Sequence, residues 1–228
     1  MKGIGASERF FKKIKSLDEA RGKEVSALVR SNYLKALDIS LPADKECTDN
    51  KTRCFLWIRN GDYEECRNLN EYGFDQICGL LKLLKVEPIL IGNKAEFAHP
   101  DGANLIEFWH RPELPELSGD PGAQLKHLIE QVREKNIQFS IGMKSGGMDG
   151  LCFATGLPTL FIGKNKKLES RMVTLANVFP FIHVEGRFEG EGKEKRFDGF
   201  SCVQLEELKT QIRFILNRRA SEKKSDAF

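Results

Sequence analysis

The sequence predicts an α/β protein with an open, mostly parallel, doubly wound sheet and an N-terminal helical extension. Short, almost wholly apolar runs alternate with segments whose apolar residues recur at helical spacing, as in parallel strands joined by crossover helices. Strands that are apolar throughout also indicate a sheet covered on both faces. The clearest strands are residues 54–58 (CFLWI) and 139–143 (FSIGM).

Residues 1–42 are expected to form the helical extension. The run Ser16-Leu17-Asp18-Glu19 matches a capping box, in which the Ser16 hydroxyl caps the helix and Glu19 reaches back. Apolar residues then repeat at helical spacing up to Pro42, which ends the pattern. An amphipathic helix of this kind packs on its own sheet or on a partner, so the segment is also a candidate for contacts in a homo-oligomer or with a partner chain.

Residues 43–217 are expected to form the Rossmann-like domain. Asn70 is a candidate N-cap, residues 186–199 are predicted to be a mobile glycine-rich loop, and residues 218–228 a disordered tail. Strands are predicted at 54–58, 88–92, 104–108, 139–143, 157–162 and 181–184, and helices at 72–84, 123–135, 148–155, 168–176 and 205–216.

Composition excludes several classes of function. A net charge of +3 over 228 residues is too small to argue for nucleic-acid binding. No apolar run is long enough for a transmembrane segment, and the basic N-terminus lacks the apolar core of a secretory signal. The six cysteines include no CxxC and the four histidines no HxxxH, so no metal site is predicted. Scattered cysteines indicate a reducing compartment, and the expected location is cytoplasmic.

A polar elbow between the strand at 139–143 and the next helix is the strongest candidate site. It consists of Lys144, Ser145, Gly146 and Gly147. Glycines allow close approach of a ligand, the first helix amides are unpaired, and the lysine adds a full positive charge, which together suit a phosphate or pyrophosphate. Asp149, in the first helical turn, is a candidate either to stabilise the helix dipole or to accept a hydrogen bond from a sugar hydroxyl. The competing interpretation is a tight turn with an N-cap and no ligand, since neither GxxxxGK[ST] nor GxGxxG occurs.

A second loop is expected beside this elbow. If the strands follow the doubly wound order 3-2-1-4-5-6, the first and fourth are neighbours at the topological switch point, where ligands bind. The loop after the first strand carries Arg59, Asn60 and Asp62. Two distant stretches would then bring cations and amide donors to one crevice. The alternative is that Arg59 pairs with Asp62 in a solvated loop.

The segment FSIGMKSGGMDGLCFATGLPTLFIG resembles the nucleotide-sugar-binding segment of GT-B glycosyltransferases, and the IRNGD loop is faintly similar to the arginine-bearing loop of fucosyltransferases. The resemblance covers roughly residues 54–184. It implies that Arg59 contacts a pyrophosphate, that residues 144–147 contact the phosphates or the sugar, and that Arg171 is a further phosphate contact. GT-B enzymes have two such domains, whereas this chain has room for one, so it is a fragment, one half of a two-chain enzyme, a compact relative or a degenerate binding domain.

Three functions remain open on the sequence. The first is a glycosyltransferase, or its donor-binding half, that uses a nucleotide sugar and an unidentified acceptor, with Asp62 and Asp149 as candidate catalytic bases. Neither a cofactor nor a metal is required if Arg59 and Lys144 neutralise the phosphates. The second is a non-catalytic module that binds a nucleotide or a protein. The third is a nucleotide-sugar hydrolase, in which water replaces the acceptor.

Overall fold

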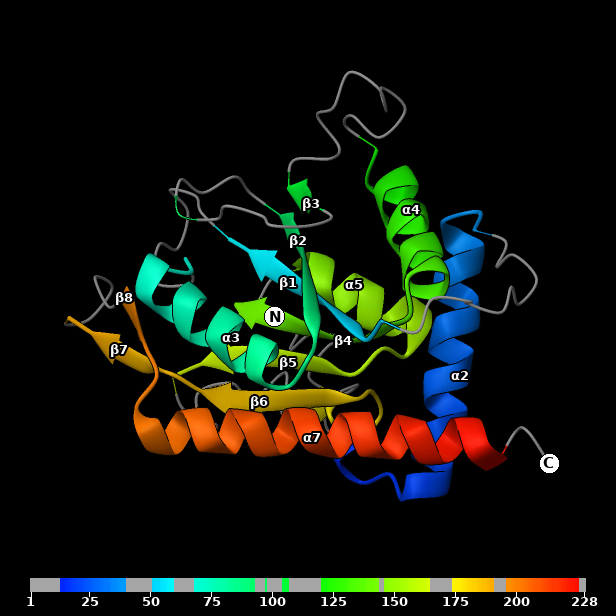
Figure 1. The fold of residues 1–228 in the computed structure, drawn as a ribbon. Coiled ribbons are helices and arrows are strands. Elements are labelled where there is room, and N and C mark those ends of the chain that lie inside the picture. Colours follow the sequence, from blue (N-terminus) through cyan, green and yellow to red (C-terminus); the bar gives the residue numbers. More distant parts are fainter. Residues whose placement is uncertain are drawn as a thin grey trace, which may run out of the picture.

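A computed structural model describes residues 13–39, 51–59, 68–92, 97, 104–106, 120–143, 146–164, 174–190 and 196–225. Within these residues six parallel strands form one sheet in the order β3-β2-β1-β4-β5-β6, with helices on both of its faces (Figure 1). The predicted doubly wound sheet is confirmed, and its strand order is the 3-2-1-4-5-6 order on which the expected site depended. The strands are β1 (Arg53–Ile58), β2 (Glu87–Gly92), β3 (Asn104–Ile106), β4 (Ile137–Met143), β5 (Thr159–Gly163) and β6 (Phe181–Glu185).

The first and fourth strands lie side by side at the switch point. Leu56 pairs with Ile141 and Trp57 with Gly142, and both strands are buried along their whole length. The chain leaves β1 toward β2 and β3, then returns to β4 on the other side of β1. Because the pairing is parallel, the loops that follow β1 and β4 leave the same edge of the sheet.

Each face of the sheet has its own hydrophobic cluster, as the period of two along a strand requires. Phe55 and Trp57 belong to one cluster, whereas Cys54, Leu56 and Ile58 belong to the other. Helices α2 (Glu19–Ala36), α4 (Pro121–Glu134) and α5 (Gly146–Thr155) pack on the first, and α3 (Glu71–Leu83) and α7 (Cys202–Ser225) on the second.

The helical extension is part of this core. Val25, Val29 and Tyr33 of α2 pack against the cluster that contains Trp57, and α2 lies against α5. Leu28, by contrast, is 61% exposed. No helix in the described part of the chain is both long and apolar enough to cross a membrane.

The caps of the helices confirm one prediction and correct another. Asn70 caps α3, accepting the Gly73 amide at 2.9 Å, as predicted. The cap of α2 is Asp18, which accepts the Arg21 amide at 2.9 Å, and not Ser16, whose hydroxyl donates to the Lys13 carbonyl at 2.8 Å. The capping-box prediction was therefore wrong: a preceding turn takes Ser16, and the carboxylate two residues later caps the helix.

The predicted mobile loop at 186–199 was wrong for the residues that the structure describes. Strands β7 (Arg187–Glu189) and β8 (Arg196–Gly199) form an antiparallel hairpin, and residues 191–195 lie outside the described part. Phe197 is 2% exposed, and its ring lies 5.5 Å from that of Phe188, so an aromatic pair anchors a segment that is otherwise charged.

The last helix also extends beyond its predicted end. α7 continues through residues 218–225, where a disordered tail was expected. Those residues contain neither proline nor glycine and are rich in arginine, lysine, alanine and glutamate, which favour helix. The predicted helix at 168–176 falls mostly on residues outside the described part.

Candidate functional site

The carboxyl edge of the sheet brings two of the predicted site segments together. Arg59 directly follows the last residue of β1, and α5 begins at Gly146, three residues after the end of β4. Since β1 and β4 are paired neighbours, the Arg59 backbone and the first turn of α5 lie at one edge. Asn60, Asp62, Lys144, Ser145 and Arg171 lie outside the described residues.

The backbone of Arg59 is fixed by contacts on both sides. Its carbonyl accepts the Leu69 amide at 3.1 Å, which ties the end of β1 to the segment that leads into α3. On the other side, Gly92 ends β2 with a φ of +105°, and a Cβ there would come within 2.1 Å of the Ile58 carbonyl oxygen. Only glycine permits both that backbone conformation and that contact, so the ends of β1 and β2 are closely packed.

Gly147 lies against the ring of Trp57. A Cβ at this position would be 2.8 Å from Cζ3 of the ring, which is closer than real side chains approach. The indole is fixed by a 2.6 Å hydrogen bond from its Nε1 to the buried Ser140 hydroxyl. Gly147 is nevertheless exposed on its outer side. A glycine at position 147 therefore allows α5 to approach β1 closely. This packing role is separate from any room that the glycine leaves for a ligand.

Asp149 lies in the interior, between α5 and α2. It is 6% exposed, and its negative charge contributes to raising the pKa of both Tyr33 and Cys152, although burial is the larger cause for each. The Tyr33 hydroxyl of α2 also lies close to this turn of α5: a Cβ placed on Gly150 would be 2.8 Å from the hydroxyl oxygen. The Asp149 carboxylate is therefore part of the contact between these two helices.

Three cysteines lie in or beside the hydrophobic core, and two of them are fully buried. Cys54 is 0% exposed, and burial raises its pKa well above the usual range. Burial raises the pKa of Cys152 to about 12 and that of the half-buried Cys78 to about 11. A thiol that stays protonated at neutral pH is a poor nucleophile, so these groups serve packing.

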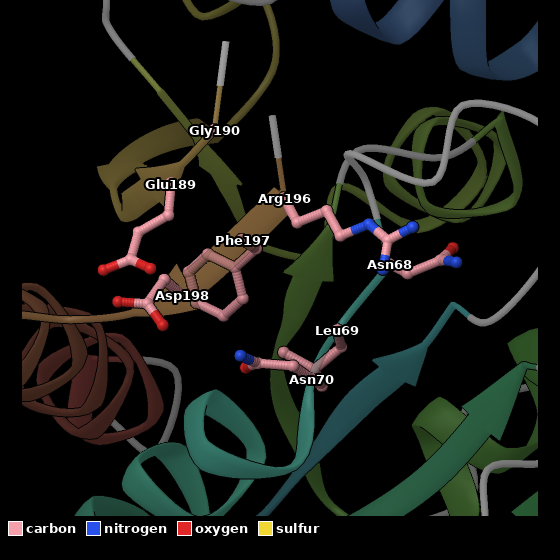
Figure 2. Close-up of a pocket in the computed structure, with 8 residues that line it drawn as sticks. All are labelled: Asn68, Leu69, Asn70, Glu189, Gly190, Arg196, Phe197 and Asp198. Atoms are coloured by element: carbon pink, nitrogen blue, oxygen red, sulfur yellow. The ribbon is translucent and has the colours of Figure 1, made fainter. Parts of the chain in front are cut away.

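A pocket of about 480 Å³ lies between the hairpin β7–β8 and the start of α3 (Figure 2). Leu69, whose amide binds the Arg59 carbonyl, belongs to its wall, so the pocket adjoins the loop after β1. The sequence prediction missed it because the hairpin was expected to be mobile. The lining residues are Asn68, Leu69, Asn70, Glu189, Gly190, Arg196, Phe197 and Asp198.

The ring of Phe197 packs the hairpin against Gly73 of α3 and against Gly186, which follows β6. A Cβ on Gly73 of α3 would lie 2.2 Å from this ring, and one on Gly186 would lie 2.6 Å from it, so both glycines make room for the aromatic side chain. Lys164, which follows β5, lies 5.4 Å from the centre of the Phe188 ring and contributes a cation–π contact from the sheet edge.

Among the described residues, no group of three or more His, Cys, Asp or Glu side chains is arranged to hold a metal ion. Comparison with known protein families, with curated proteins and with solved structures found no match.

Proposed function

We propose that the protein binds the diphosphate of a nucleotide sugar at the carboxyl edge of its sheet, and acts as a glycosyltransferase or as the donor-binding half of one. The observation that carries the proposal is the pairing of β1 with β4, which places Arg59 and the first turn of α5 at one edge. A guanidinium and unpaired helix amides are the groups that bind phosphate oxygens most strongly.

The same groups would assist the chemistry. As the bond between the sugar and the diphosphate breaks, negative charge develops on the leaving nucleoside diphosphate. Fixed positive charge and amide dipoles directed at that position stabilise it without reorganisation. In this mechanism Arg59 and the amides of α5 bind the leaving group, Lys144 and Arg171 add charge, and Asp62 remains the candidate base that takes the acceptor proton.

A non-catalytic nucleotide-binding module is the second candidate, and the burial of Asp149 favours it. This carboxylate was one of two candidate bases, yet it is 6% exposed and lies against α2. A base must reach the acceptor hydroxyl within hydrogen-bonding distance, which a group enclosed between two helices does not do without opening the contact.

Isothermal titration with UDP, GDP and their sugars tests the binding proposal. Arg59→Ala and Lys144→Ala should each weaken the tightest interaction by roughly 1.5–3 kcal/mol, the contribution of a hydrogen bond to a charged group. Arg213→Ala, which removes an exposed arginine from α7, is the matched control and should leave the affinity unchanged. Wild-type affinity in both test variants would contradict the proposed site.

Incubation of the protein with a bound nucleotide sugar then separates enzyme from module. Release of nucleoside diphosphate, with or without an added acceptor, supports catalysis. Retained binding without release over hours supports the module.

A further inference from the structure

The pocket beside the hairpin is lined by charged side chains of both signs together with amide and apolar groups. Glu189 and Asp198 contribute carboxylates, and Arg196 contributes a guanidinium. In Figure 2 the guanidinium of Arg196 extends toward Asn68, whereas the two carboxylates lie together at the other side of the view. The hairpin register pairs Glu189 with Arg196 and Phe188 with Phe197, and the Phe197 ring also belongs to the pocket wall.

This lining disfavours a phosphate. The lining contributes two carboxylates and one guanidinium, and Arg187, which is not a lining residue, pairs with Asp198 at 2.5 Å, so the site offers a phosphate no excess of positive charge. A phosphate placed here would lie close to Glu189 and Asp198, whose carboxylates would repel it. The proposed diphosphate is therefore expected at Arg59 and α5, and the pocket suits a neutral ligand better.

The same lining suits a ligand with several hydroxyl groups. A carboxylate accepts hydrogen bonds from hydroxyls through about four lone-pair positions, while a guanidinium with five N–H groups and an amide with two can donate to hydroxyl oxygens and still keep other interactions. The Asn70 side chain uses its oxygen to cap α3, which leaves its amide N–H₂ as a donor at the pocket wall. A volume of about 480 Å³ lies within the range of small-molecule sites.

The geometry points to a sugar ring as the occupant of this pocket, bound through its hydroxyls to Glu189, Asp198 and the amides of Asn68 and Asn70. Where the ring belongs to the donor, the inference rests on the proposed function, because the Leu69–Arg59 hydrogen bond joins the pocket to the diphosphate edge. Where the ring belongs to a free or acceptor sugar, the pocket chemistry is the same.

Titration with three kinds of probe tests this assignment. UDP and GDP alone report binding at the diphosphate site. A sugar is added in UDP-glucose, UDP-N-acetylglucosamine, GDP-mannose and GDP-fucose. Methyl glycosides carry a sugar without a diphosphate, and their binding is measured by saturation-transfer NMR. The variants are Glu189→Ala and Asp198→Asn, and Glu207→Ala on an exposed part of α7 is the control.

Loss of a hydrogen bond to a carboxylate is expected to weaken a sugar-bearing probe about tenfold or more, and to leave bare UDP and GDP unaffected. Such a loss confined to nucleotide sugars assigns the pocket to the donor, and a loss confined to glycosides assigns it to an acceptor or free sugar. The inference is overturned if no sugar-bearing probe responds to either variant, or if bare diphosphates weaken equally. Failure of the proposed function would be a separate result: no nucleotide probe would bind to the wild-type protein.

Discussion

The ring of Trp57 on β1 lies directly against Gly147 at the start of α5, so closely that a Cβ on the glycine would be 2.8 Å from ring atom Cζ3. This contact joins the two segments that the sheet places at its carboxyl edge. It fixes the distance between the end of β1 and the first turn of α5, and with it the geometry of any site between them.

Replacement of Gly147 by alanine is expected to destabilise the protein by about 1–3 kcal/mol, since the added methyl forces a rigid, hydrogen-bonded ring to move. Urea denaturation measures the change. Gly79→Ala is the control, because a Cβ at that position in α3 meets nothing within 4 Å. In a helix interior this control should raise stability by about 0.5–1 kcal/mol. Equal effects in the two variants would contradict the contact.

The hydrogen bond between Trp57 and Ser140 gives a second prediction. Trp57→Phe removes the Nε1 donor and leaves the buried Ser140 hydroxyl without it, at a cost of about 1–3 kcal/mol in the free energy of unfolding, besides the smaller ring. The double variant Trp57→Phe/Ser140→Ala should recover part of that loss, because both polar partners are then absent. Additive losses in this cycle would contradict a direct bond.

The hairpin depends on one aromatic anchor. Phe197→Ala is expected to destabilise the protein by about 3–5 kcal/mol and to increase amide hydrogen exchange at Arg196–Gly199, because the ring fills the slot between Gly73 and Gly186. Phe214→Ala, which removes a side chain that is 61% exposed on α7, should be nearly neutral. A neutral Phe197→Ala would mean that the hairpin is not packed on α3.

The buried thiols predict a loss of stability at alkaline pH. Burial raises the folded-state pKa of Cys152 to about 12 and of Cys78 to about 11, so above pH 9 the unfolded chain releases these protons before the folded protein does. The free energy of unfolding should therefore fall between about pH 9 and pH 12. Cys152→Ala should flatten part of this fall relative to wild type, and an unchanged slope would contradict the role of this thiol.

The sheet could be predicted from the sequence because each strand is an isolated apolar run between helical patterns. Phe55 and Trp57 face one cluster while Cys54, Leu56 and Ile58 face the other, which is why residues 54–58 of β1 contain no polar position. The alternation of strands and helices predicted a doubly wound sheet, and the order 3-2-1-4-5-6, which the sequence left as a condition, is the one that places the end of β1 beside α5.

The hairpin and its pocket could not be predicted on the same ground. Residues 186–199 carry many charges and glycines. The hairpin that they form depends on Phe188 and Phe197, which pack on each other and on residues far away in the sequence. The repeated triplets RFE and RFD, each an arginine, an aromatic and an acid, were the available signal. The placement of Asp149 was also beyond sequence reasoning, since the first turn of a helix is as compatible with an open edge as with a neighbouring helix.

A crystal structure of the protein with bound UDP or GDP would show where the diphosphate binds. We expect diphosphate oxygens within about 2.7–3.2 Å of both the Arg59 guanidinium and the backbone amides of the first turn of α5. A diphosphate bound elsewhere, in contact with neither group, would contradict the proposed site.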